Sequence, residues 1–231
     1  MRLAISQSNY LPWIGYFKLI AKVDNFVFYD QVQYTKNDWR NRNRIMLHGT
    51  ARWITIPVRY RFSDCLSINQ IRLPAGNWRE EHLERISDAY SDQNDFNLHF
   101  ASLKNIISAD YQYLSQLNQK IIKYYANLFE VRTNFHTSHT INLKLDRNQR
   151  IIETCKDFSA DTYVCSPKSL NYLDQALFEK NGIKVEVIDY DNCLSAYRQN
   201  SNAFDPFVSF IDVLFMTGMR EIKSRLGSSG T

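Results

Sequence analysis

The first thirty residues constrain the fold more than any other part of the chain. Two short runs of β-forming residues, "RLAIS" at 2–6 and "FVFYD" at 26–30, flank a segment with helical spacing. Pro12 suits the first turn of that helix. The apolar positions that follow it are Tyr16, Leu19, Ile20 and Val23. This order of strand, turn, helix and strand predicts a βαβ unit whose two strands pair in parallel.

The same alternation returns in the C-terminal half. We expect strands at 140–145, 161–165 and 183–190, with helices at 148–158 and 173–182 between them. A last helix is expected with Asp205 as its N-cap, Pro206 as its first residue and Gly218 at its end.

Between these two regions the chain is predicted to be helical. "WITIPV" at 53–58 is expected to be one more strand, and Asn77 and Glu80 fit a capping arrangement ahead of amphipathic helices. We therefore predict a three-layer α/β fold with a mostly parallel, Rossmann-like or nucleotidylyltransferase-like sheet and a helical insertion at about 77–130. A single domain is expected over 1–226, with a flexible tail at 227–231.

Positive charge gathers in one segment. The net charge is +4, but 36–61 contains seven basic residues and one acidic residue, so this segment carries +6 and the remainder −2. Arg40, Arg42 and Arg44 are spaced by two, which in a strand places them on one face. Such a row matches phosphates or carboxylates. Alternatively, the row is neutralised by acids from elsewhere, such as Glu80, or faces solvent.

Ligands of open α/β sheets bind beyond the carboxyl ends of the strands. The segments to inspect are therefore "SQSNYLPWIGY", "DQVQYTKNDW" and "CSPKSLNY", each of which follows a predicted strand. Gln7, Asn9 and Tyr10 could hydrogen-bond a polar ligand near a helix N-terminus, or could be ordinary turn residues. The chain has no GxGxxG or P-loop motif and only seven glycines, which disfavours a dinucleotide or P-loop site.

Two carboxylates and one thiol stand out. Asp30 ends a predicted strand, and Asp212 interrupts an apolar helical run. A buried carboxylate needs a partner, and an arginine of the basic segment is the expected one. Asp212 is then either a salt-bridge anchor, or a general base or substrate orienter. Cys165 follows a strand and is either a nucleophile or a buried spectator.

The remaining patterns exclude more than they indicate. The four cysteines form no CxxC pair and are interpreted as free thiols of a reducing compartment. His136 and His139 have an HxxH spacing but no evident third ligand, so no metal is expected. No run is long enough to cross a bilayer, and polar residues interrupt the apolar N-terminus; a cytoplasmic location is expected. The oligomeric state stays open.

Several stretches together resemble the WbqC-like protein family of bacteria. They include "QSNYLPWIGYFKLI", "VFYDQVQYTKNDWRNRNRI", "SADTYVCSPKSLNYLD" and "FVSFIDVLFMTG". The resemblance implies a role in lipopolysaccharide O-antigen or other surface-polysaccharide biosynthesis, with transfer of an acyl or aminoacyl group, such as glycyl, to a nucleotide-linked amino sugar. It departs at Ser8, where many relatives have proline, and after "DTY", where many have a glycine pair. The layout also resembles nucleotidylyltransferases with an HxGH motif, whose histidines are absent here.

The resulting hypothesis assigns residues to two roles. The candidate catalytic residues are Gln7, Tyr10, Asp30 and Asp212. The candidate substrate-binding residues are Asn9, Tyr16, Gln33, Tyr34, Lys36, Trp39, Arg40, Arg42, Asn43 and Arg44. The expected ligands are a nucleotide-linked sugar and an acyl-activated or aminoacyl-activated donor, with a carrier protein or tRNA as a further candidate partner and no certain cofactor. The alternative is a non-catalytic nucleic-acid or carrier-protein binding module that uses the same arginines.

Overall fold

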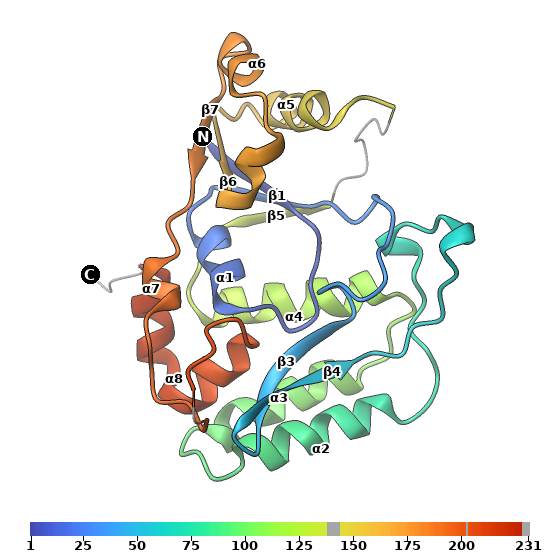
Figure 1. Cartoon of the computed structure of the whole chain (residues 1–231), viewed down its shortest axis with the longest axis vertical. Helices are drawn as coiled ribbons and strands as arrows, with labels where there is room; N and C mark the ends of the chain where they lie inside the picture. The colour runs from blue at the N-terminus through green and yellow to red at the C-terminus, as the bar shows by residue number, and fades with distance from the viewer. Residues whose placement is uncertain (138–143, 202, 228–231) are drawn as a thin grey trace.

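A five-stranded parallel sheet forms the centre of the protein (Figure 1). The computed structural model describes residues 1–137, 144–201 and 203–227. The strands are β1 (Arg2–Ser6), β2 (Asn25–Phe28), β5 (Asn134–Thr137), β6 (Thr162–Cys165) and β7 (Lys184–Val187). Their order is β5-β2-β1-β6-β7, and every neighbouring pair is parallel. The predicted parallel pairing of the first two strands is therefore confirmed.

Helices cover both faces of the sheet and give three layers. In Figure 1, α5 and α6 lie above the sheet, whereas α1 and α4 lie below it. The bounds are α1 (Ile14–Ala21), α4 (Leu114–Leu128), α5 (Arg147–Asp157) and α6 (Gln175–Lys180). From β1 the chain adds β2 and β5 on one side of the sheet, and it then adds β6 and β7 on the other side of β1. This reversal of strand order is that of doubly wound Rossmann-like folds. The predicted three-layer α/β class is confirmed.

Side chains that alternate along the strands build a separate core on each face. In β1, Leu3 belongs to the core beside α5 and α6, whereas Ala4 belongs to the larger core with α1 and α4. In β2, Val27 faces the first core, and Phe26 and Phe28 face the second. Strands buried on both faces are apolar throughout, which is why "FVF" lacks polar alternation.

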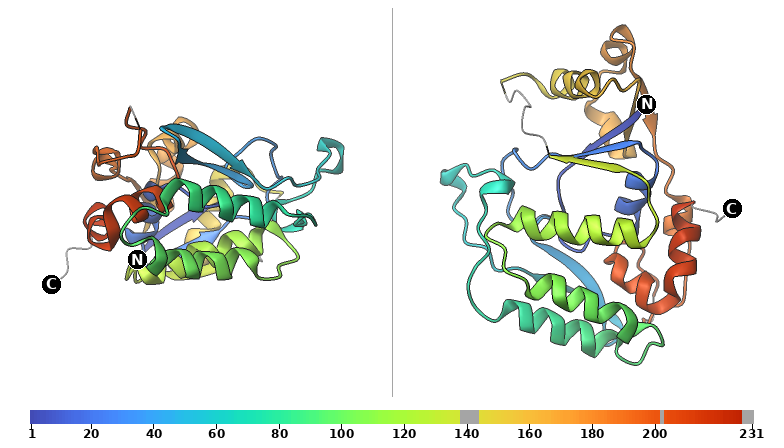
Figure 2. Two further views of the ribbon diagram at one scale, coloured as in Figure 1. Left: turned by 90° about the horizontal axis from the view of Figure 1, so that it is seen from below. Right: turned by 180° about the vertical axis from the view of Figure 1, so that it is seen from behind.

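A β-hairpin and two helices form a second region below the sheet. The hairpin consists of β3 (Arg42–Leu47) and β4 (Thr50–Thr55), joined at His48 and Gly49, which both have positive φ as a tight hairpin turn requires. It packs on α2 (Trp78–Tyr90), with α3 (Phe96–Ser108) beyond (Figure 2). Three short helices, η1 (Phe62–Asp64), η2 (Ile68–Gln70) and η3 (Pro167–Tyr172), lie in connections.

The C-terminal helices pack beside α1. They are α7 (Asp191–Leu194) and α8 (Phe210–Leu226). No helix in the described ranges is long and apolar enough to cross a membrane.

Some predicted boundaries are wrong for local reasons. The strand expected at 53–58 is β4, which ends at Thr55, because its register follows the hairpin turn. Helix α8 starts four residues later than the predicted Pro206, and the Ser209 side chain caps it. Gly218, with a φ of 76°, interrupts the helix at the predicted position, but a second helical stretch follows it to Leu226. Asn77 precedes α2 but makes no side-chain capping bond. The strand expected at 140–145 falls largely on 138–143, outside the described residues, as does most of the predicted tail.

Candidate ligand-binding site

A cavity of about 1010 Å³ opens at the carboxyl ends of β1, β2 and β6. Ser6 and Gln7 line it after β1, Tyr29 after β2, and Cys165 and Ser166 after β6. It therefore occupies the point where the strand order reverses, the usual ligand position in this architecture. Its size is at the upper end of the range for small-molecule sites.

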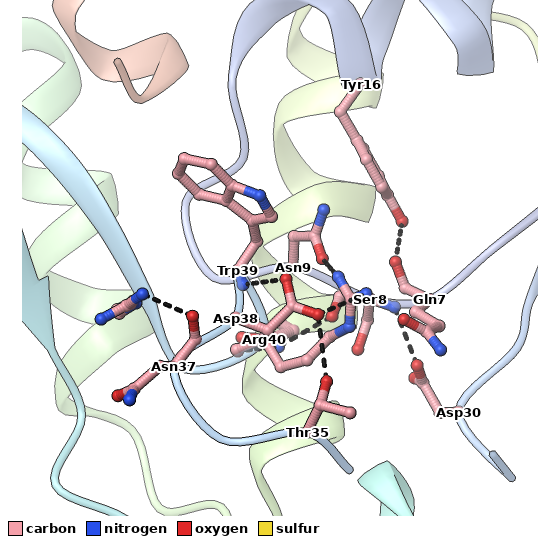
Figure 3. Close-up of polar contacts among 12 residues, drawn as sticks. Gln7, Ser8, Asn9, Tyr16, Asp30, Thr35, Asn37, Asp38, Trp39 and Arg40 are labelled. Atoms are coloured by element: carbon pink, nitrogen blue, oxygen red, sulfur yellow. Dashed lines mark hydrogen bonds and ion pairs between the residues drawn. The ribbon is translucent and has the colours of Figure 1, made fainter. Parts of the chain in front are cut away.

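The turn after β1 is held in place by a buried carboxylate. Asp30, which is 1% exposed, accepts hydrogen bonds from the Ser8 backbone N–H and from Gln119 Nε2, both at 2.8 Å. The hydroxyl of Tyr16 donates to the Gln7 carbonyl at 2.9 Å (Figure 3). Burial raises the pKa of the Asp30 carboxyl, and the bonds from Ser8 and Gln119 oppose that rise. Asp30 does not line the cavity, so it acts by positioning this turn.

Arg40 extends from the turn before β3 to the cavity. Its guanidinium donates to Asn9 Oδ1 and pairs with Asp38 at 3.4 Å, while Nε has no partner among the described residues (Figure 3). The Arg40 carbonyl accepts from Asn118 Nδ2 at 2.8 Å, which ties this turn to α4. Burial lowers the pKa of Arg40. Arg40 is thus held through its side chain by Asn9 and Asp38 and through its backbone by Asn118.

A second group of cations faces the same cavity, and we call it the cationic wall. It consists of Arg147 and Arg150, on the first turn of α5, and Lys168 of η3. None of the three forms an ion pair within the described part of the chain. Arg147 instead lies 4.3 Å from the ring centre of Tyr172, whose hydroxyl donates to Ser169 Oγ at 3.0 Å. No Asp, Glu or His is among the described residues that line the cavity.

Four further residues of the lining are hydrophobic, and we call them the apolar wall. It consists of Trp13, Tyr190, Leu194 and Phe207. The Trp13 ring lies 5.0 Å from Tyr190 and 5.4 Å from Phe207, between ring centres. Gly15 makes this packing possible, because a Cβ there would lie 2.2 Å from Cζ2 of Trp13. The Trp13 indole therefore lies directly over the start of α1.

The structure separates the predicted site residues, catalytic and substrate-binding, into two sets. The predicted residues that line the cavity are Gln7, Asn9, Tyr16, Gln33, Trp39, Arg40 and Asn43. Those outside its lining are Tyr10, Asp30, Tyr34, Lys36, Arg42, Arg44 and Asp212.

The expected single row of three arginines is wrong. Arg40 precedes β3, whereas Arg42 and Arg44 lie on the outer face of the hairpin against Trp53, at 4.1 and 5.7 Å from its ring centre. Arg44 also pairs with Asp205 at 2.8 Å. The intervening asparagines have structural roles. Asn43 Nδ2, for example, donates to the Leu11 carbonyl at 2.6 Å.

Two predicted site tyrosines are core residues. Tyr10 is fully buried, and its hydroxyl lies 3.0 Å from Nδ1 of His82. Burial raises the pKa of Tyr10 and lowers that of His82 to about 4. Tyr34 packs on Tyr60 at 5.0 Å between ring centres, and burial raises its pKa to about 12. Neither tyrosine is placed to meet a ligand in the cavity. Lys36 is exposed.

Asp212 has partners, but not the predicted arginine. Tyr90 and Tyr197 donate hydroxyl hydrogen bonds to it at 2.7 and 2.5 Å, and Gln199 Nε2 donates at 3.0 Å. Burial raises the pKa of Asp212 against these bonds. Three neutral donors satisfy the carboxylate, and the network joins α2 and α8 away from the cavity lining.

Two further sequence candidates are Cys165, as a nucleophile, and the HxxH histidines, as metal ligands. Cys165 lines the cavity but is 2% exposed, and burial raises its pKa to about 11, which keeps the thiol protonated at neutral pH. His136 hydrogen-bonds Asn25 Oδ1 at 2.8 Å, and His139 lies outside the described residues. The described residues contain no group of three or more His, Cys, Asp and Glu that could hold a metal.

Fold and site together define a Rossmann-like α/β protein with a cation-lined cavity at its topological switch point. The chain belongs to the WbqC-like protein family, whose model matches residues 7–224. It is 34% identical over 222 residues to the uncharacterized protein Rv1507c of Mycobacterium tuberculosis, with 94% of each chain covered. No solved structure shows significant similarity. The resemblance read from the sequence is therefore confirmed at the level of the family.

Proposed function

We propose that the cavity binds a phosphate-bearing small molecule, namely a nucleotide-linked sugar, as substrate of an acyl or aminoacyl transfer in surface-polysaccharide biosynthesis. The observation that carries the proposal is the charge of the lining. Arg40, Arg147, Arg150 and Lys168 face one cavity, with no carboxylate among the described lining residues.

Such a lining is unfavourable without an anion. Like charges brought together in a partly desolvated cavity repel, and the three cations of the cationic wall have no protein ion-pair partner in the described ranges. A diphosphate offers several acceptor oxygens, which match the planar donor fork of arginine and the point charge of lysine. The cavity of about 1010 Å³ has room for a base or a sugar beside the phosphates.

The residues of the cavity are suited to catalysis that aligns the two reactants. Gln7 and Asn9 supply amides, and Arg40 and the cationic wall supply positive charge, but the described lining has no carboxylate or imidazole to act as a general base. The transfer would then depend on aligning the two reactants and stabilising developing negative charge. In this proposal Asp30 keeps the turn at Ser8 in shape, and Asp212 takes no part.

A second function has one observation in its favour. Trp53 is 40% exposed, has Arg42 over its ring, and touches Trp39 at 5.3 Å between ring centres. Exposed aromatic rings with arginines are typical of platforms that stack nucleic-acid bases. Binding of RNA through this face should weaken steeply with salt, whereas a small-ligand cavity responds less and is chemically selective.

Thermal melting against a panel of ligands tests the proposal. The panel contains ATP, UDP-sugars, dTDP-amino sugars, coenzyme A and a short RNA. A ligand present at about 100 times its Kd adds about 2.7 kcal/mol, or about 5–10 °C at this chain length. We expect a selective shift for a nucleotide-sugar that Arg147→Gln and Lys168→Gln reduce.

Two matched variants control for the loss of charge alone. Arg61 and Lys104 are exposed and lie outside the cavity lining, so Arg61→Gln and Lys104→Gln should keep the full shift. A shift with RNA alone, or equal losses in all four variants, would contradict the cavity as the binding site.

A further inference from the structure

Exposed hydrophobic side chains gather at this cavity. Eight large hydrophobic residues are exposed in the described part of the protein, and four of them line it: Trp39, Tyr172, Leu194 and Phe207. Phe207 and Leu194 belong to the apolar wall, and Phe207 is 48% exposed. A concentration of exposed apolar surface inside one concave site marks a place where an apolar group is buried on binding.

The apolar wall is a built surface. The Trp13 ring packs on both Tyr190 and Phe207, and its position depends on the absence of a side chain at Gly15. Phe207 is anchored through its backbone, because its carbonyl accepts a hydrogen bond from Arg44 at 3.3 Å and its N–H donates to Asp205 at 2.9 Å. The backbone hydrogen bonds of Phe207 therefore hold its ring at the cavity.

The charges in the cavity limit what this wall can accept. Every charged side chain in the described lining is positive. The ammonium of an aminoacyl group would find no carboxylate in this lining and would be repelled by the three cations of the cationic wall, which have no ion-pair partner among the described residues. Burying an unpaired charge costs far more than burying a neutral apolar group of the same size.

We infer that the ligand carries an uncharged apolar group, such as an acyl chain, which packs on the apolar wall while its phosphate contacts the cationic wall. This inference rests on the proposed function and narrows it, because it selects an acyl group over an aminoacyl group. The ligand class is a phosphate ester or anhydride with a neutral apolar arm.

Three simple probes separate the two halves of the inference. Methyl phosphate carries only the anion, n-hexyl phosphate adds a neutral chain, and 6-aminohexyl phosphate adds a chain of the same length that ends in an ammonium. Their Kd values are measured by protein-observed NMR titration of the tryptophan indole signals. Because each buried methylene contributes to affinity, we expect hexyl phosphate to bind at least about tenfold more tightly than methyl phosphate. The aminohexyl ester should show no such gain.

Two matched variants test whether the tighter binding of hexyl phosphate comes from the apolar wall. Phe207→Ser removes an exposed ring, and Leu98→Ser removes an exposed side chain of α3 outside the cavity. Leu98→Ser should leave the affinities of all three phosphate esters unchanged. Only Phe207→Ser should abolish the advantage of the hexyl chain.

The outcomes distinguish failure of the inference from failure of the proposed function. Suppose first that methyl phosphate binds and that Lys168→Gln weakens this binding, as the proposed function requires. The apolar-group inference alone is then overturned by any one of three results: hexyl phosphate binds no more tightly than methyl phosphate, the aminohexyl ester gains as much affinity as the hexyl ester, or Phe207→Ser leaves the hexyl advantage unchanged. If no phosphate ester binds, or Lys168→Gln and Arg147→Gln leave binding unchanged, the proposed function is overturned together with the inference.

Discussion

Gln119 Nε2 donates a 2.8 Å hydrogen bond to Oδ2 of Asp30, and this bond links helix α4 to the end of β2. The other oxygen of the same carboxylate holds the Ser8 N–H. The neighbouring Asn118 donates to the Arg40 carbonyl at 2.8 Å. One turn of α4 therefore fixes both loops that bring Gln7, Asn9 and Arg40 to the cavity. The helical segment between the hairpin and β5 supports the site directly.

The first prediction concerns Asp30. In Asp30→Asn one acceptor oxygen becomes an NH2 donor, which leaves either the Ser8 N–H or the Gln119 amide without its partner. An unsatisfied buried donor costs about 1–3 kcal/mol, so the free energy of unfolding should fall by that amount in urea denaturation. An unchanged free energy of unfolding would contradict the role of Asp30 in holding this turn.

The second prediction concerns Asp212 and pH. Its pKa is raised by burial in the folded protein above the usual value of 3.8. The folded state therefore binds this proton more tightly than the unfolded state, and the resulting stability is lost as pH rises from about 4 through the folded pKa. Asp212→Asn removes this titration. The free energy of unfolding of both proteins is measured in urea at several pH values. The value for wild type minus that for Asp212→Asn should decline as pH rises. An increase would contradict a raised pKa of Asp212 in the folded protein.

The third prediction concerns Gly15. Helix propensity alone predicts that Gly15→Ala stabilises α1 by about 0.5–1 kcal/mol. Because the added Cβ meets the Trp13 ring at 2.2 Å, we expect destabilisation and a changed tryptophan near-UV signal instead. A double-mutant cycle with Trp13→Ala checks the cause. Without the indole, the alanine should no longer be costly, and an unchanged cost would place the strain elsewhere.

The fourth prediction separates two arginines. Arg40→Gln should weaken binding of the nucleotide-sugar about tenfold or more, as expected for loss of a charge-assisted hydrogen bond. Arg42→Gln should leave the affinity nearly unchanged, because Arg42 stacks on Trp53 and donates to the Asn37 carbonyl outside the cavity lining. Isothermal titration calorimetry measures both. Equal losses would support the single arginine row expected from the sequence.

The first βαβ unit could be predicted from the sequence because local patterns specify it, whereas β5 (Asn134–Thr137) and the strand order could not. Pro12, the helical spacing after it and the flanking apolar runs fix the βαβ unit without distant information. Positions 161–165 and 183–190 were recognisable for the same reason. The turn at His48 and Gly49 was missed, and with it the hairpin register that places Arg42 and Arg44 on the face opposite Asn43.

The cationic wall could not be predicted residue by residue. Arg147, Arg150 and Lys168 lie more than one hundred positions from Arg40, and they meet it only because β6 pairs with β1. Lys168 lies in "CSPKSLNY", which follows a predicted strand, and ligands of such sheets bind beyond the carboxyl ends of the strands. This position was the one signal in the sequence that pointed to Lys168. The positions of Tyr10 and Asp212 outside the cavity lining could not be predicted, because sequence does not reveal that their polar atoms hydrogen-bond with His82 and with two tyrosines.

The most direct test of the central claim is calorimetric titration of the nucleotide-sugar that gives the largest melting shift. Wild type is compared with the double variant Arg147→Gln/Lys168→Gln and with the control double variant Arg61→Gln/Lys104→Gln, at one salt concentration. We predict that the first double variant raises Kd at least about tenfold while the control changes it little, since only the first removes cavity charges. Equal Kd values in all three proteins would contradict the cavity as the phosphate site.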